Sequence, residues 1–403
     1  MNYVIFDDHK WENFFPITLT RSTADLRVGI LKLRQRLNEY FKINKQRIII
    51  SDHLEDIYSA RFPDWQINKL NNGKTIFLNS RLKVDKDIAK KINELPENTC
   101  LTSNDDILAA KMNSKESVVS IDRILSMFEN LERIDINKNY CWQYIWELIA
   151  CNSEYIEQDF QDFFYDKDNY FETELGITVL NPYNIWIGEG ATIKPGVVID
   201  ASSGPVIIDE KALIMPNAVI IGPVFIGKNS LIKAGAKIYK GTTIGPMCKI
   251  GGEIEETIIQ AYSNKQHDGF LGHSYLGEWI NLGAGTNNSD LKNNYKNVKS
   301  YFYPIKNKVD TGLQFLGVII GDHTKTGINS TINTGSVISV GCNIFGNELI
   351  KDFIPALSWG KCSNLNEYKL DKFIETAGIV KNRRKLEFSI LEKKLYQSIR
   401  KLK

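Results

Sequence analysis

The sequence predicts an α/β domain followed by a parallel β-helix and a helical tail, and three observations support this. Only Gly29 and Gly73 of the 28 glycines precede residue 176. Isoleucine recurs every six residues from Ile208 to Ile250. The residues before this repeat alternate between apolar runs and amphipathic patterns. A chain of 403 residues is also long for one domain. We therefore expect domains at residues 1–175 and 176–362 and a tail at 363–403.

The first part has the alternation typical of an α/β domain with a largely parallel sheet. The segments "MNYVIF", "INKQRIIIS" and "KTIFLN" are expected to be buried strands. The segment "ADLRVGILKLRQRLNEYF" places its apolar residues at helical spacing. The segments "DDILAAKMN" and "DRILSMFENLERI" suggest further helices.

The second part repeats with a period that neither a helix nor a strand produces. Isoleucine occupies 208, 214, 220, 226, 232, 238, 244 and 250, and the period returns as Phe270, Leu276 and Leu282. It returns again as Ile320, Thr326, Ile332, Ile338, Ile344 and Ile350. Hexapeptide repeats build a parallel β-helix, with one short strand per hexad in one wall of a triangular coil. Each residue of the series is expected to point inward.

The tail is expected to be helical. Phe388, Leu391, Leu395, Ile399 and Leu402 form one apolar stripe. From Lys381 onward the tail carries nine basic and two acidic residues. We expect the stripe to pack on the β-helix.

Composition narrows the class of protein. With 43% hydrophobic and 24% charged residues and a net charge of +2, the chain gives no general reason to expect a nucleic-acid partner. The opening "MNYVIFDDHKWENFF" lacks the pattern of a signal peptide, and no stretch approaches 18 apolar residues, so we expect no membrane insertion. Six cysteines without CxxC spacing favour reduced thiols in a cytoplasmic protein.

The stretch "HDGFLGHSYLGEWINLGAGTNN", residues 267–288, carries the most specific motif of the chain. With this stretch, an α/β domain of Rossmann-like type and a left-handed β-helix, the chain resembles the GlmU-type family. In that family a sugar-1-phosphate nucleotidylyltransferase is fused to an acetyltransferase. The family's acetyltransferase motif aligns without a gap and places its catalytic histidine on His267. Its tyrosine then falls on Phe270 and its asparagine on Asn281. A rival alignment selects His273 but breaks the hexad phase.

The chemistry of acetyl transfer suits these residue types. A sugar amine must lose a proton before it attacks the thioester of acetyl-CoA, and a group with a pKa near 6.5 is suited to accept it. The backbone of "LGAGT" can donate to the oxyanion and lets a pantetheine arm approach closely. The resemblance implies CoA contacts at Ala284, Gly285 and Thr286.

The chain departs from the family pattern around the acceptor. Phe270 lacks the hydroxyl of the family tyrosine, which Tyr275 or Tyr262 is expected to replace. Lys233 matches a family arginine that holds the sugar phosphate. The next basic position falls in the acidic "GGEIEETII", so the acceptor can differ from glucosamine 1-phosphate.

Two further positions concern the cofactor. Asp290 stands where the family has an asparagine after the motif. Lys296 matches a lysine near the CoA phosphates, beside Lys292.

The head matches the family less well. The family's glycine-rich triphosphate loop is replaced by "FDDHKWENFFPITLTR", which has no glycine. Asp7 and Asp8 are expected to hold Mg²⁺ with an NTP, UTP in the family, because this ion prefers oxygen ligands. Arg21, Asp25 and Arg27 are the candidate phosphate contacts. Asn79 stands where the family has a metal-binding aspartate.

Other functions remain open. Three imidazoles suit Zn²⁺, so His267, His273 and His323 also suggest a zinc site of the carbonic-anhydrase kind. The chain can also be an acetyltransferase of a nucleotide-linked amino sugar with an inactive head, or a non-catalytic trimeric scaffold that binds sugar nucleotides. The resemblance itself implies a homotrimer that acts on a sugar phosphate and a nucleotide.

Overall fold

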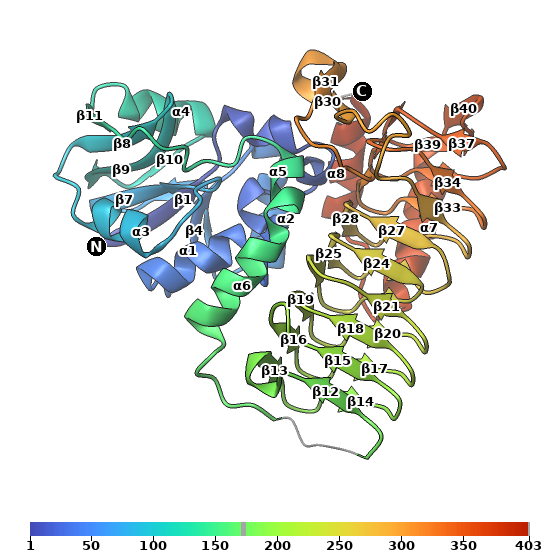
Figure 1. The fold of residues 1–403 in the computed structure, drawn as a ribbon. Helices are drawn as coiled ribbons and strands as arrows, with labels where there is room; N and C mark the ends of the chain where they lie inside the picture. Colours follow the sequence, from blue (N-terminus) through green and yellow to red (C-terminus); the bar gives the residue numbers. More distant parts are fainter. Residues whose placement is uncertain (171–174, 402–403) are drawn as a thin grey trace.

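The computed structural model describes residues 1–170 and 175–401 and shows an α/β head packed along one side of a parallel β-helix (Figure 1). The head contains a seven-stranded sheet in the order β11-β8-β9-β7-β1-β4-β5. Its pairings are parallel except those of β9. The strands are β1 Asn2–Phe6, β4 Arg47–Ile49, β5 Gln66–Ile67, β7 Gly73–Asn79, β8 Thr99–Ser103, β9 Asp106–Ser114 and β11 Glu132–Asp135. The helices are α1 Leu33–Phe41, α2 Asp52–Arg61, α3 Lys86–Asn93, α4 Ile121–Phe128, α5 Ile145–Ala150 and α6 Asn152–Phe163.

One expected helix of the head is wrong. The segment "DDILAAKMN" forms strand β9, which is paired with both β7 and β8. Leu108, Ala109 and Ala110 are fully buried there. A short apolar run buried on both faces has no period that distinguishes a strand from a helix.

The second part is a parallel β-helix with three walls, as the hexad period predicts. Strands of each wall pair in parallel with the strands one coil away. Wall one contains β13 Ile185–Ile187, β16 Val206–Ile208, β19 Val224–Ile226, β22 Thr242–Ile244, β25 Ile258–Ala261, β28 Tyr275–Glu278, β32 Ile319–Ile320, β35 Val337–Ile338 and β38 Phe353–Ile354. Wall two contains β12 Thr178–Leu180, β15 Val198–Asp200, β18 Val219–Ile221, β21 Lys237–Ile238, β24 Glu253–Glu255 and β27 Phe270–Gly272, followed by β29 Asn287–Asn288, β34 Thr331–Ile332 and β37 Leu349–Ile350. Wall three contains β14 Thr192–Ile193, β17 Leu213–Ile214, β20 Leu231–Ile232, β23 Lys249–Ile250 and β26 Asn264–Lys265, then β33 Lys325–Thr326, β36 Asn343–Ile344, β39 Ser358–Lys361 and the antiparallel β40 Asn364–Glu367.

The inward positions follow the predicted series with two exceptions near the motif. Leu271, not Phe270, is the buried inward residue of β27, where it pairs with Ile254 of the coil before. The shift arises because this coil is shorter than 18 residues: Ile244 pairs with Ile259. In β26 the inward position is held by a charged residue, Lys265, which pairs with Ile250 and is 2% exposed.

The head covers wall one of its own chain. Helix α6 lies along this wall (Figure 1), and the Asn152 side chain donates to the carbonyl oxygen of Gly241 at 2.7 Å. The Thr243 hydroxyl donates to the carbonyl oxygen of Gly29 at 2.8 Å. An apolar cluster that includes Phe160 and Phe225 joins the two surfaces. The edge between walls two and three therefore lies away from the head.

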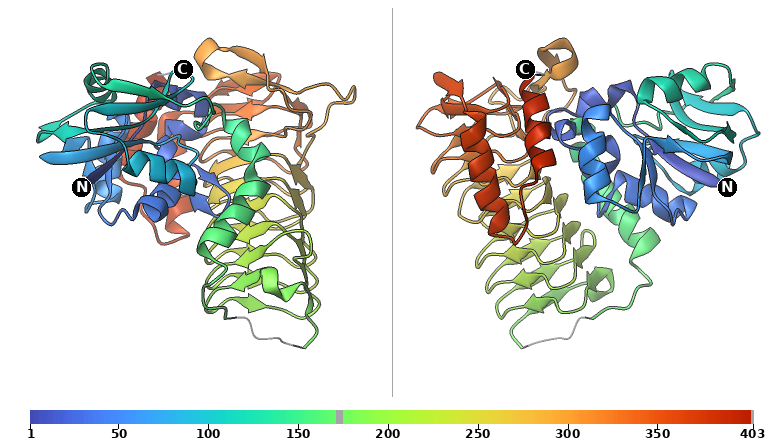
Figure 2. Two further views of the ribbon diagram at one scale, coloured as in Figure 1. Left: turned by 60° about the vertical axis from the view of Figure 1, so that its left-hand side comes forward. Right: turned by 180° about the vertical axis from the view of Figure 1, so that it is seen from behind.

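An insertion and the tail complete the upper coils. The insertion, residues 289–317, carries the hairpin of β30 Lys299–Phe302 and β31 Asn307–Asp310. The tail forms α7 Leu370–Asn382 and α8 Ile390–Lys401; α8 packs against α2 of the head, and α7 lies along the β-helix (Figure 2). Leu395 and Ile399 of the predicted stripe are buried in a cluster with head residues such as Leu54. Leu402 lies outside the described residues.

Candidate functional site

The edge where wall three turns into wall two brings several predicted residues together. The corners at residues 233–235, 251–252, 266–269 and 283–286 stack along it, and we call this the His267 edge. The Lys233 N–H donates to Ile250 at 2.7 Å, and the Gly251 N–H donates to Lys265 at 2.6 Å. The Gly285 N–H donates to the carbonyl oxygen of Asp268 at 3.1 Å. Along this open edge Lys233 therefore lies two coils before His267, and the glycine-rich turn lies one coil after it.

His267 occupies an exposed corner between β26 and β27. Within the described part of the chain its ring has no hydrogen-bond partner, whereas its carbonyl oxygen accepts from the Lys265 ammonium at 2.6 Å. A ring held only through its backbone is accessible to a substrate amine.

Lys265 supports this corner from inside the coil, and no sequence pattern singled it out. Its ammonium lies between the carbonyl oxygens of His267 and, at 3.5 Å, Gly251. Burial lowers the pKa of Lys265 to about 8. A Cβ on Gly252 would lie 2.9 Å from this nitrogen and 2.8 Å from the His267 oxygen, so glycine is required there. The break in the hexad pattern at Lys265 was the available signal.

The glycine-rich turn has one free donor. Four N–H groups of the turn already have acceptors. Leu282 donates to Asn264, and Gly283 donates to the Thr326 hydroxyl. Gly285 donates to Asp268, and Thr286 donates to Gly283. The Ala284 N–H has no partner among the described residues, so it can donate to an oxyanion. The Thr286 hydroxyl is used within the turn, where it donates to Gly283 at 2.7 Å. Gly285 has a φ of +70°, which favours glycine.

Phe270 and Asn281 flank this edge. Phe270 is half-buried on wall two, next to Glu253 of the coil before. Its N–H donates to the Asn287 side chain at 2.7 Å. Asn281 is exposed on wall three between Asn264 and Lys325. Both side chains are accessible from outside the coil, as contacts to an acceptor require.

His273 lies on a different edge, between walls two and one, at the base of the insertion. Its Nδ1 is 2.8 Å from Asp290 Oδ2, and its ring stacks on Phe315 with centroids 5.1 Å apart. The CoA contact of Asp290 stays a prediction, and in this structure its carboxylate is paired with His273. Lys296 is exposed in the insertion and remains available.

The three histidines do not share a zinc site within one chain. His323 lies on the third edge and is 3% exposed, and burial lowers its pKa well below the usual value. His267, His273 and His323 thus occupy three separate edges. Among the described residues no group of three or more His, Cys, Asp or Glu side chains is arranged to hold a metal ion.

Tyr275 cannot replace the missing tyrosine hydroxyl. It is fully buried on wall one, where its hydroxyl accepts from the Arg27 N–H at 2.9 Å and donates to the Arg27 carbonyl oxygen at 3.0 Å. The side chain of Gln260 also donates to it at 2.9 Å. The hexad pattern did not reveal that the head covers this wall.

The predicted phosphate contacts of the head face the β-helix. Arg21 is 4% exposed and pairs with Asp322 and, at 3.1 Å, Glu278. Arg27 is buried, and its guanidinium donates to the Ile30 carbonyl oxygen at 2.5 Å. Asp25 pairs with Lys32 and Arg34 at 3.0 and 2.9 Å. These charged side chains are already paired or hydrogen-bonded within the head or between the head and the β-helix, so none faces an open phosphate site.

A salt-bridge network occupies the carboxyl ends of β1 and β7, where ligands bind in open α/β sheets. The buried Arg81 guanidinium pairs with Asp8 at 2.5 Å and with Asp106 at 2.7 Å. Lys10 also pairs with Asp106 at 2.8 Å. The Asn79 side chain donates to Asp8 at 2.8 Å. Asp8 is therefore bound by the Arg81 cation and the Asn79 amide of its own domain.

Asp7 lies beside this network but is 1% exposed. The Ser22 hydroxyl donates to it at 3.0 Å, and burial raises the pKa of Asp7 to about 7. A carboxyl group whose pKa is raised in this way is partly protonated near pH 7, and the protonated form is a weak ligand for Mg²⁺. The predicted metal pair at Asp7 and Asp8 is thus not formed in this conformation.

The fold and this motif define an α/β head of nucleotidyl-transferase type joined to a hexapeptide-repeat β-helix. Residues 3–166 match the family described as sugar nucleotidyl transferase. The chain is similar to the bifunctional protein GlmU of Synechococcus elongatus, with 26% identity over 200 residues that cover 45% of this chain and 40% of the relative. It is also similar to the bifunctional sugar-1-phosphate nucleotidylyltransferase/acetyltransferase of Sulfurisphaera tokodaii, with 36% identity over 150 residues that cover 36% and 37%. Both similarities are to bifunctional proteins, and the chain spans less than half the length of each of these two relatives.

Among solved structures, the UDP-N-acetylglucosamine acyltransferase of Francisella novicida matches with 16% identity and a TM-score of 0.31 over 51% of this chain and 71% of that one. No helix in the described ranges has the length and apolar character needed to span a bilayer.

Proposed function

We propose that the β-helix is an N-acetyltransferase that transfers the acetyl group of acetyl-CoA to the amine of an amino-sugar 1-phosphate, with glucosamine 1-phosphate as the first candidate. The observation that carries this proposal is the exposed His267 on the same edge as the free Ala284 N–H and Lys233. The similarity to bifunctional transferases supports the substrate class.

Each group has a defined chemical role in the proposal. His267 accepts a proton from the sugar amine as the nitrogen attacks the thioester carbon. The Ala284 N–H donates to the oxyanion of the tetrahedral intermediate. The carbon–sulfur bond then breaks, and the CoA thiolate leaves and takes up a proton. Lys233 neutralises the sugar phosphate, Phe270 and Asn281 contact the sugar, and Gly285 and Thr286 border the CoA arm, whose phosphates Lys296 attracts.

We further propose that the active form is a homotrimer. Wall one is covered by the head, so self-association would use walls two and three on either side of the His267 edge. A neighbouring subunit placed there would supply the partners that the His267 ring lacks within its own described chain. For this assembly we propose a cytoplasmic location, which the six free cysteines favour.

For the head we propose nucleotidyl transfer from an NTP, UTP in the first instance, a reaction in which a bound Mg²⁺ would offset the negative charge of the phosphates. The residues present do not fit the ion as they stand, because Asp8 is paired with Arg81 and Asp7 is buried. A second candidate follows from this network: the head is inactive, and the β-helix acetylates a nucleotide-linked amino sugar.

Mass spectrometry of products separates these possibilities. The protein is incubated with acetyl-CoA and each of a panel of amino-sugar 1-phosphates and UDP-linked amino sugars, with and without each NTP. Acetylated sugar phosphate and release of pyrophosphate support both activities. Acetylation of only the nucleotide-linked sugars supports the second candidate, and no acetylation of any acceptor refutes the acetyltransferase.

A further inference from the structure

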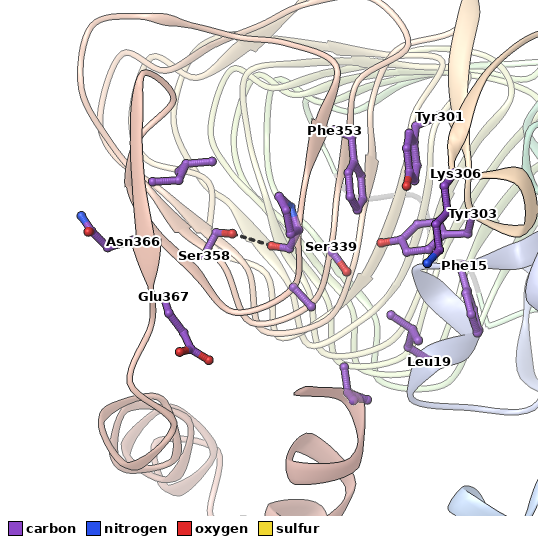
Figure 3. Close-up of a pocket in the computed structure, with 14 residues that line it drawn as sticks. Phe15, Leu19, Tyr301, Tyr303, Lys306, Ser339, Phe353, Ser358, Asn366 and Glu367 are labelled. Atoms are coloured by element: carbon purple, nitrogen blue, oxygen red, sulfur yellow. Dashed lines mark hydrogen bonds between the residues drawn. The ribbon is translucent and has the colours of Figure 1, made fainter. Parts of the chain in front are cut away.

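A cavity of about 500 Å³ lies where four parts of the chain meet (Figure 3). Its walls come from the head at Phe15 and Leu19, the insertion at Tyr301 and Tyr303, the upper coils of the β-helix, and the tail at Ile399. It lies against wall one and the corners that follow this wall, whereas the His267 edge joins walls three and two. The cavity is therefore separate from the proposed acetyl-transfer site.

The aromatic side chains of this cavity are held firmly. Tyr301 and Phe353 stack with ring centroids 3.9 Å apart and an interplanar angle of 6°. Tyr303 meets Phe353 edge-on at 5.2 Å and Phe15 edge-on at 5.4 Å. Because these rings fix one another, the cavity is largely preformed, and its volume falls in the range of small-molecule sites.

Two hydroxyl groups in the wall have no regular hydrogen-bond partner among the described residues: those of Ser339 and Tyr303. Ser339 is fully buried, and Figure 3 shows the two hydroxyls directed toward one another across the cavity. Burial raises the pKa of Tyr303, and hydrogen bonding from the nearby Ser339 hydroxyl opposes this rise. Tyr303 therefore stays protonated, and both groups can donate.

A buried hydroxyl without a partner costs about 1–3 kcal/mol, so an acceptor placed between these two would be stabilised. Lys306 adds a positive charge at the rim, beside Tyr303 in Figure 3. The remaining surface is largely apolar, with Leu19, Leu365 and Ile399. It also carries Ser358, Asn366 and Glu367, and the Glu367 carboxylate is paired with Arg400 at 2.7 Å. The arrangement thus has two or three donors at one side and a largely apolar region at the other.

We propose that this cavity binds a small amphipathic monocarboxylate, whose carboxylate accepts hydrogen bonds from Tyr303 and Ser339 and whose acyl or aryl body packs on Phe353, Leu19 and Ile399. Since the walls come from the head, the insertion, the β-helix and the tail, the bound molecule stabilises the contact among all four. The proposal is independent of the acetyl-transfer chemistry, because it uses none of the residues of the His267 edge.

The test is binding of octanoate and 4-phenylbutyrate to the full chain by isothermal titration calorimetry and thermal shift, with octanol as the uncharged comparison. We expect both carboxylates to bind and to raise the melting temperature, and octanol to bind at least tenfold more weakly. Tyr303→Phe, which removes one hydroxyl and keeps the ring, should weaken octanoate binding by about 10- to 100-fold, as expected for a hydrogen bond to a charged group. Tyr301→Phe is the matched control in the same cavity and should bind as the wild type does.

Three results would overturn the proposal. The first is no binding of either carboxylate to the wild type at millimolar concentration. The second is equal binding of octanol and octanoate. The third is unchanged octanoate affinity in both Tyr303→Phe and Ser339→Ala, which would show that the two hydroxyls do not form the site.

Discussion

Lys265 gives the sharpest prediction about stability, because it places a charge at an inward position of the β-helix. We consider Lys265→Met, which keeps an unbranched side chain of similar length and removes the ammonium. The inward neighbours along this wall are Ile250 and Leu282, which are buried. Methionine should therefore fit the core without a cavity.

The magnitude follows from the pKa of the amine. Folding lowers it from 10.5 to about 8, which corresponds to about 3 kcal/mol of destabilisation at pH 7. The variant also loses the hydrogen bond to His267, a loss of about 1–2 kcal/mol. We therefore expect Lys265→Met to be more stable than the wild type by about 1–2 kcal/mol at pH 7. The sign depends on pH: the penalty is fully present below pH 8 and disappears as pH rises toward 10.5, so the advantage of methionine disappears there too.

Urea unfolding of both proteins between pH 7 and pH 10.5 measures this difference, and ionisations common to the two chains cancel. Lys249→Met, one coil earlier on the outer face of the same wall, is the control and should change stability little. The reasoning is refuted if Lys265→Met is less stable than the wild type at pH 7, or if the difference between them stays constant over the whole pH range.

Three further predictions concern assembly, the tail and the head. Light scattering should give a trimer at micromolar concentration, and a monomer would contradict the proposed assembly. Glu392→Ala should lower the free energy of unfolding by about 3 kcal/mol, because it leaves the buried Lys381, 2.6 Å away, without its partner. The control is Lys393→Ala at an exposed position of the same helix. Equal effects of the two substitutions in urea unfolding would refute this role of Glu392. If the head transfers nucleotidyl groups, Asp8→Asn should abolish pyrophosphate release while acetyl transfer continues; release that persists in this variant would exclude Asp8 from the reaction.

The repeat made the β-helix predictable because a period of six identifies the coil and its inward residues directly. The gapless motif likewise placed His267, Lys233 and the glycine-rich turn in stacked corners of one edge. The edge on which each of these residues lies follows from its position in the repeat, so no contact between distant parts of the chain had to be predicted.

What the sequence could not provide was the docking of the head on wall one. Arg21, Arg27 and Tyr275 look like ligand contacts in isolation, yet they are buried against one another or against carboxylates between the two domains. The cluster of Asp8, Arg81 and Asp106 could not be predicted either, because its members lie at the ends of three different strands and up to 98 residues apart. Such pairings depend on tertiary contacts, which no local pattern encodes.

The most direct test of acetyl transfer at the His267 edge compares three proteins under the same conditions: the wild type, His267→Ala and His273→Ala. Each is assayed for acetylated product by mass spectrometry, with acetyl-CoA and the best acceptor of the panel. Loss of a general base typically costs roughly 10²- to 10⁴-fold, so we expect His267→Ala to lose activity in this range and His273→Ala to stay within several-fold of the wild type. A His273→Ala variant that loses most of its activity, while His267→Ala retains it, would contradict the account.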